Sequence, residues 1–168
     1  MTAAGETYCL DANVLIHGWQ DYYSPKLCPE YWDVLNQLGD RGTIFIPAMV
    51  QEEIVRTDDD LSHWLQGSRI PVHQIDGPVT ECLQTIYSKN PVHRLLVDNT
   101  RYRSLADPWV IAHAIHENAV VVTKEENITA ANSSKIKIPN VCENMGVQCI
   151  NDFQMLGRLG IRFTCLLS

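Results

Sequence analysis

Four carboxylates stand where an α/β protein usually carries its chemistry. Asp11 directly follows a short apolar stretch at residues 7–10, and Glu125 lies just beyond the apolar run at 119–123. Glu53 follows a second apolar stretch, and Asp107 opens a segment with a helical pattern. Carboxylates gathered at one place repel each other, so such a cluster needs a cation between them. Oxygen ligands favour Mg²⁺ or Mn²⁺, and two such ions about 4 Å apart can activate a water for attack on a phosphodiester.

Three of these residues also have a structural explanation that involves no chemistry. Asp11 fits a helix cap or a turn, and Glu125 fits a surface loop. Asp107 is followed by Pro108, which is typical of an N-cap with proline at the first helical position. Glu53 is the unusual one, because helical periodicity puts it on the apolar face of its helix, where an unpaired charge is costly.

The elements that position these residues alternate between strands and helices. Strands are expected at residues 7–10, 43–46, 119–123 and 148–150, and helices at 29–39, 47–56, 107–118, 139–146 and 151–159. Residues 58–105 are expected to be mostly helical, with turns at the glycines and prolines. The alternation predicts an α/β sandwich around a parallel sheet. In such sheets, sites gather beyond the carboxyl ends of the strands.

The bulk composition predicts one globular domain over residues 1–168. Hydrophobic residues make up 45% of the chain and charged residues 20%, which is ordinary for a folded domain. No apolar run reaches the length of about 18 residues that a membrane span requires. The first residues have neither the basic region nor the apolar core of a secretory signal. A cytoplasmic protein without membrane association is therefore expected, in which the six cysteines stay reduced as small hydrophobes.

The net charge of −7 is unevenly distributed. Residues 1–84 hold 4 Lys and Arg against 13 Asp and Glu, whereas residues 85–168 hold 9 against 7. An acidic total disfavours tight, nonspecific binding to nucleic acid, although bound divalent cations offset an acidic site. The acidic net charge also fits binding to a basic partner protein.

Four short segments resemble a PIN domain in their order and spacing: residues 10–16, 46–54, 106–114 and 120–125. The resemblance covers residues 7–125, and the later segments 137–142 and 151–156 are similar to an uncharacterised PIN-like branch close to VapC-type toxins. It implies a three-layer α/β/α fold with a central parallel sheet. It also implies metal-dependent hydrolysis of RNA that leaves a 5′-phosphate and a 3′-hydroxyl.

By position, the resemblance makes Asp11, Glu53 and Asp107 the ligands of Mg²⁺ or Mn²⁺. Glu125 takes the place of a fourth acid, where PIN domains more often carry Asp, and Glu126 or Asn127 could substitute for it. Asn13 and Thr123 would hold ligands or substrate, and Lys124 would lie near the site. Candidate RNA contacts are Arg94, Arg101 and Arg103.

Many proteins of this kind are toxins silenced by an antitoxin that covers the site, and they are often dimeric. The resemblance therefore implies an endoribonuclease that acts through a metal-activated water as the toxin of a toxin–antitoxin pair. Two alternatives stay open: an RNA-processing nuclease that is not a toxin, and a PIN-like binding module without turnover.

Other chemistries fit the sequence less well. A haloacid-dehalogenase-type phosphatase needs a second acid two residues after the first, and that position holds Asn13. His113 and His116 are spaced for a zinc site on a helix, but the sequence offers no obvious Cys or His to complete it. Neither a P-loop nor a dinucleotide-binding glycine motif occurs.

Overall fold

The computed structural model describes residues 5–97, 105–127 and 135–168. Five parallel strands form one sheet in the order β3-β2-β1-β4-β5. They are β1 (Tyr8–Leu10), β2 (Ile44–Pro47), β3 (Val72–His73), β4 (Val120–Val122) and β5 (Cys149–Ile150). The predicted α/β fold with a central parallel sheet is confirmed.

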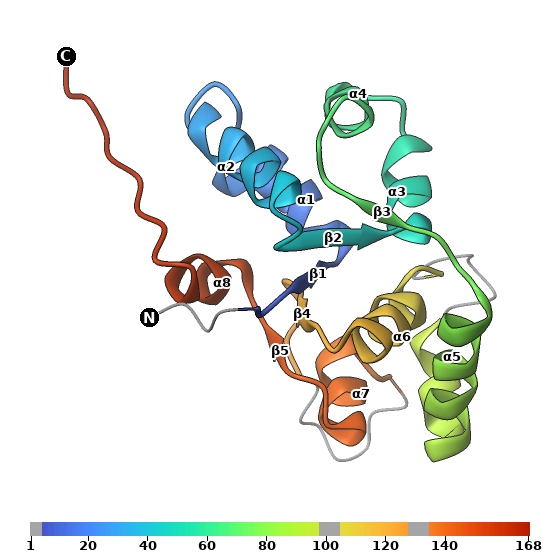
Figure 1. Ribbon diagram of the computed structural model, residues 1–168. Helices are drawn as coiled ribbons and strands as arrows, with labels where there is room; N and C mark the ends of the chain where they lie inside the picture. The colour runs from blue at the N-terminus through green and yellow to red at the C-terminus, as the bar shows by residue number, and fades with distance from the viewer. Residues whose placement is uncertain (1–4, 98–104, 128–134) are drawn as a thin grey trace.

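Helices cover both faces of this sheet, which makes the three layers visible in Figure 1. Helices α5, α6 and α7 lie on one side, and α1, α2 and α8 lie on the other. The α-helices are α1 (Ala12–His17), α2 (Pro29–Asp40), α3 (Ala48–Val55), α4 (Asp60–Gln66), α5 (Gly77–Lys89), α6 (Asp107–Glu117), α7 (Ile138–Met145) and α8 (Asp152–Arg158). A π-helix, η1 (Gly18–Tyr22), extends α1, and a 3₁₀ helix, η2 (Pro91–Leu96), follows α5.

The central strand β1 has the register that a buried parallel strand requires. Tyr8 pairs with Ile44 on one side and Val120 on the other, and Leu10 pairs with Val122. All three residues of β1 and all three of β4 are buried. These strands are apolar throughout because helices cover both of their faces.

The strand β3 is an unexpected element in residues 58–105, a segment that is otherwise mostly helical, as expected, where the structure describes it. Val72 and His73 pair with Ile46 and Pro47 and add an edge strand to the sheet. Two residues directly after Pro71 are too few to show the alternation that identifies a strand from sequence. Part of this prediction, residues 98–104, lies outside the described residues.

The direction of α6 decides which residues share an edge of the sheet. The helix ends at Glu117, and β4 begins three residues later at Val120, opposite Tyr8 at the start of β1. Helix α6 therefore begins at the opposite edge, beyond the end of β1.

Within the described residues, no helix is long and apolar enough to cross a membrane.

Candidate functional site

Asp11 stands at the end of the central strand and is almost completely buried, with 3% of its surface exposed. Its backbone N–H continues the ladder by donating to the carbonyl of Val122 at 2.9 Å. Its Oδ1 accepts from the Ala12 N–H at 2.7 Å, and its Oδ2 accepts from the Thr123 hydroxyl at 2.8 Å. Asp11 is thus the N-cap of α1, as the structural explanation predicted. An ionised carboxylate offers about four acceptor positions, so capping leaves it capacity for a further ligand.

The Thr123 hydroxyl holds Asp11 and links it by hydrogen bonds to Asn13 and Glu125. It accepts from Asn13 Nδ2 at 3.2 Å and from the Glu125 N–H at 3.1 Å while it donates to Asp11. Asn13 Oδ1 in turn accepts from the Lys124 N–H at 2.9 Å. These bonds tie the start of α1 to the loop after β4 and fix the orientation of the Asp11 carboxylate.

Replacing Thr123 by valine is expected to lower the free energy of unfolding by about 1–3 kcal/mol, because buried partners lose their hydrogen bonds. The pKa of Asp11 should also rise further, since the Thr123 hydroxyl stabilises the ionised form. Thr123→Ser keeps the hydroxyl and serves as the matched control. Urea denaturation of the three proteins checks the expectation, and equal stability of Thr123→Val and Thr123→Ser would contradict it.

The surroundings of Asp11 raise its pKa to about 7. Burial is the largest cause, and the negative charges of Glu125 and Glu53 raise the pKa further. The hydrogen bonds from Thr123 and Ala12 act in the opposite direction but do not offset burial. Asp11 is therefore a desolvated acid with two more acids close enough to interact with its charge.

Glu53 lies on α3, as predicted, but the side chain is exposed, so the expectation of a buried charge was wrong. The buried face of this eight-residue helix runs through Ala48, Val50 and Ile54, and Met49 is only half-buried. Glu53 falls on the flank between Met49 and Val50, which faces solvent. Its carboxyl is still crowded enough that partial desolvation raises its pKa.

Asp107 is the first residue of α6, and 8% of its surface is exposed. The N-cap of this helix is Ala106, so the interpretation of Asp107 as the N-cap was wrong by one residue. Val110, one turn further on, accepts a hydrogen bond from Cys9 Sγ at 3.6 Å and so fixes α6 against β1. Because α6 runs back from the carboxyl edge of the sheet, Asp107 lies at the same edge as Asp11.

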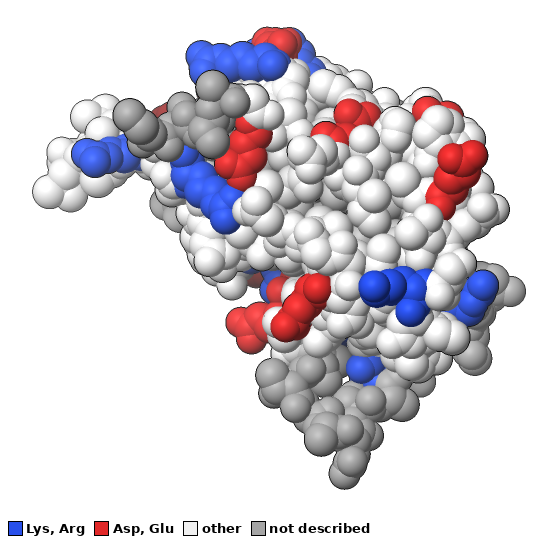
Figure 2. Space-filling view, turned by 60° about the horizontal axis from the view of Figure 1, so that its bottom comes forward, with Lys and Arg blue, Asp and Glu red and all other residues white. Residues whose placement is uncertain are grey.

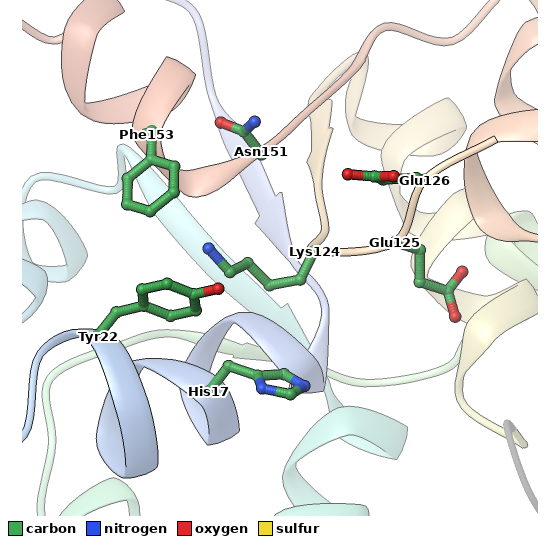
Figure 3. Close-up of a pocket in the computed structure, with 7 residues that line it drawn as sticks. All are labelled: His17, Tyr22, Lys124, Glu125, Glu126, Asn151 and Phe153. Atoms are coloured by element: carbon green, nitrogen blue, oxygen red, sulfur yellow. The ribbon is translucent and has the colours of Figure 1, made fainter.

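Glu125 lies in the loop after β4, where its carboxylate binds the start of α7. Its Oε2 accepts from the Ile138 N–H at 2.9 Å, and its Oε1 lies 3.8 Å from the Lys137 ammonium. Glu126 and Asn127 are exposed. Figure 3 shows the Glu125 and Glu126 carboxylates pointing in different directions from neighbouring positions.

The structure therefore places all four predicted acids at the carboxyl edge of the sheet without closing a metal centre. Asp11 is coupled electrostatically to Glu53 and Glu125. Among the described residues, no three His, Cys, Asp or Glu side chains converge as they stand on one position for an ion. The residue set has the chemistry for a hard cation, and its side chains would have to turn inward to hold one.

A cavity of about 300 Å³ opens between the loop after β4 and the start of α8. Its lining residues are His17, Tyr22, Lys124, Glu125, Glu126, Asn151 and Phe153 (Figure 3). Lys124 is the cation in this lining, but its ammonium donates to Asp152 Oδ1 at 2.6 Å. It also lies 3.9 Å from the ring centre of Tyr22 and 4.1 Å from that of Phe153. Its charge is thus held in a partly buried ion pair and lies against two aromatic rings.

Sequence reasoning missed the residues that complete this cavity. Asn151 and Asp152 directly follow β5, which is the same strand-end signal that identified Asp11 and Glu125. Asp152 is fully buried, and its Oδ2 has no partner in the described part of the chain. Tyr22 and Phe153 meet edge to face with ring centres 5.6 Å apart, across 131 residues of sequence. No pattern in either segment signals that contact.

The candidate RNA contacts receive little support from the surface charge. Arg94 stacks on Tyr87, with its guanidinium 4.5 Å from the ring centre. Arg101 and Arg103 lie outside the described residues. On the face shown in Figure 2, basic and acidic side chains of the described residues are interspersed and form no continuous basic band.

Two solved structures share this fold. VapBC2 from Rickettsia felis, solved bound to a DNA fragment from its promoter, matches with a TM-score of 0.55 and 18% identity over 86% of this chain and 98% of the other. FitAcB from Neisseria gonorrhoeae matches with a TM-score of 0.50 and 15% identity over 88% of this chain and 99% of the other. At these identities the likeness establishes the fold alone, which is the PIN-like α/β/α sandwich.

The comparison with curated proteins gives no match. A family model described as a domain of unknown function, DUF4411, matches residues 8–163. This match spans nearly the whole chain, from the first residue of β1 to beyond α8, so the protein belongs to the DUF4411 family.

Proposed function

We propose that this protein is a metal-dependent endoribonuclease and the toxin of a toxin–antitoxin pair. The observation that carries the proposal is Asp11, a desolvated carboxylate at the end of the central strand with the charges of Glu53 and Glu125 acting on it. Burying a carboxylate close to like charges is unfavourable unless a cation joins them. The PIN-like fold supports the proposal because the site lies beyond the carboxyl ends of its strands.

The donor set fits Mg²⁺ or Mn²⁺, since all of its members are oxygens. Asp11, Glu53 and Asp107 would hold the ion, with the fourth place filled by Glu125, Glu126 or Asn127. Glu126 is exposed and lines the cavity, whereas Glu125 already binds the start of α7. When bound, such an ion lowers the pKa of an attacking water and stabilises the negative charge that develops on a phosphodiester.

The other residues of the site would position the ligands and the substrate. Thr123 and Asn13 hold the Asp11 carboxylate in one orientation through a closed set of hydrogen bonds. The cavity lined in part by Glu125 offers a place for part of the RNA, with Asn151 and His17 also in its lining. The charge of Lys124 is already neutralised by its ion pair with Asp152. Lys124 would therefore shape this cavity without supplying a free charge to it.

An acidic protein would bind RNA chiefly through the loaded site. The net charge is −7, so phosphate contacts alone would give weak, salt-sensitive binding. A basic antitoxin fits the same acidic edge. The likeness to VapBC2 and FitAcB is the basis on which we also propose an antitoxin partner, a homodimer and action in the cytoplasm for this chain.

The direct test of the proposal is RNA cleavage by the purified protein. Structured and unstructured RNA would be incubated with Mn²⁺, with Mg²⁺ or with a chelator, and products would be analysed for a 5′-phosphate. We expect cleavage only with metal, and at least about a hundredfold loss in Asp107→Asn, because a ligand of the ion is removed. Asp33→Asn changes an exposed acid of α2 and is the matched control.

The outcomes separate the proposed function from its alternatives. No cleavage with either metal, or equal cleavage by Asp107→Asn, would exclude the nuclease and leave a binding module. Cleavage without growth arrest on expression in a bacterial host would exclude the toxin and leave a processing enzyme. Growth arrest relieved by Asp107→Asn, and by co-expression of the neighbouring gene, is the result we expect.

A further inference from the structure

A second cavity, separate from the acidic edge, lies where β3 and the start of α5 face the last turns of α6. Its volume is about 360 Å³. The lining includes His73, Asp76, His113, His116 and Glu117. Figure 1 shows the segment from β3 to α5 running alongside α6. Three histidines and two acids thus meet at one surface hollow that the proposed nuclease chemistry does not use.

His113 is the residue that needs an explanation. Its side chain is 1% exposed, and neither ring nitrogen has a hydrogen-bond partner within the described residues. A neutral imidazole carries one donor and one acceptor, and buried polar groups are nearly always paired. An unpaired ring nitrogen on the wall of a polar cavity indicates that a ligand for it belongs in the cavity.

The neighbours of His113 supply further donors of the right kind. His73 Nδ1 lies 3.2 Å from Glu117 Oε1. The His73 ring is fixed by stacking on Phe45, with ring centres 4.1 Å apart and the planes 10° from parallel. The ring centres of His73 and His113 are 6.4 Å apart. His116 follows His113 by three residues on the same helix, so both project toward the same side.

We propose that this hollow binds a zinc-class divalent cation through His73, His113 and Glu117, with His116 as the fourth protein ligand. Two imidazoles on one zinc ion have ring centres roughly 5 Å apart, given Zn–N bonds of about 2.1 Å. As the side chains stand, no three donors among the described residues converge on one position, so binding has to draw the two rings together by about 1.5 Å.

The chemistry of the donors distinguishes this site from the acidic edge. Imidazole nitrogens favour Zn²⁺, Co²⁺ and Ni²⁺, whereas the oxygen set around Asp11 favours Mg²⁺ and Mn²⁺. Burial lowers the pKa of His113 to about 4, which keeps its ring neutral and able to coordinate near pH 7. His73 could not be recognised from the sequence as a partner of His113, because it precedes His113 by 40 residues and lies on a two-residue strand.

The proposal is tested by metal binding rather than by activity. Full-length protein treated with chelator would be titrated with Zn²⁺ by calorimetry and with Co²⁺ by absorption spectroscopy. We expect one equivalent of zinc at the hollow, at least tenfold weaker binding in His113→Gln and in His73→Gln, and unchanged binding in His63→Gln. His63 is an exposed histidine of α4 and is the matched control.

Two further measurements keep the result interpretable. His73 is only half-buried, so His73→Gln still tests the site if His113→Gln fails to fold. Asp11→Asn should leave zinc binding unchanged, which separates the hollow from the acidic edge whether or not the protein is a nuclease. The proposal is overturned if zinc does not bind, if the two histidine variants bind as tightly as wild type, or if the cobalt spectrum shows thiolate ligands.

Discussion

Replacing Asp11 by asparagine is expected to reduce metal-dependent RNA cleavage by at least about a hundredfold. In the metal-free protein, the same replacement is expected to raise the free energy of unfolding at pH values above 7. Both effects have the same cause. The ionised carboxylate is buried close to Glu53 and Glu125, so it is unfavourable for folding without a cation, and in the proposed function it is a ligand of that cation. A residue retained for structure alone would show the opposite pattern, with loss of stability.

The sign of the pH dependence follows from the direction of the pKa shift. In the folded protein the Asp11 pKa is raised to about 7 from its ordinary 3.8. The folded state therefore binds more protons than the unfolded state between these two values, and stability falls as the pH rises from about 4 to 7. An asparagine at this position is neutral throughout, so the variant should gain about 1–3 kcal/mol at pH 8. The gain should shrink as the pH falls toward 4.

Urea denaturation in the presence of chelator at pH 5 and pH 8 measures the stability effect, and the RNA assay with Mn²⁺ measures the activity. Asp33→Asn, which changes an exposed carboxylate, should leave both unchanged. Full activity in Asp11→Asn would remove this residue from the site. Equal destabilisation at both pH values would show that Asp11 acts only as the cap of α1.

Sequence patterns located the acids because parallel strands end at a common edge. Asp11, Asp107 and Glu125 each lie at a strand end or a helix start, and those elements were visible as apolar runs and proline-marked helix starts. Glu53 shows the limit of this reasoning. Its helix is only eight residues long. Which of its residues are buried depends on packing against other elements, and a helical wheel does not include that packing.

The residues around the acids depended on contacts between distant segments. Tyr22, Lys124 and Phe153 meet because η1, the loop after β4 and α8 converge at one point. His73 reaches α6 only through an edge strand of two residues, which has no recognisable period. Such contacts are set by the paths of the chain over the sheet, and no local pattern indicates them.

Replacing Lys124 by methionine is expected to lower the free energy of unfolding by about 3–5 kcal/mol, because it leaves the buried Asp152 carboxylate without its counter-ion. The Lys124 side chain is 13% exposed and the Asp152 side chain 1%. Asp152 Oδ2 has no partner among the described residues, so the carboxylate depends on the single bond from Lys124 to Oδ1. The methionine would still pack against Tyr22 and Phe153.

The double variant Lys124→Met with Asp152→Asn separates the ion pair from the packing around it. With both charges removed, most of the lost stability should return, since a buried pair replaced by uncharged groups is often close to neutral. Arg69→Met breaks the exposed pair with Asp40 and should cost less than about 1 kcal/mol. Denaturant unfolding of the four proteins measures these differences. If the double variant is as unstable as Lys124→Met, the unpaired charge of Asp152 is not the cause of the lost stability. The lysine would then stabilise the protein through its contacts with the two aromatic rings.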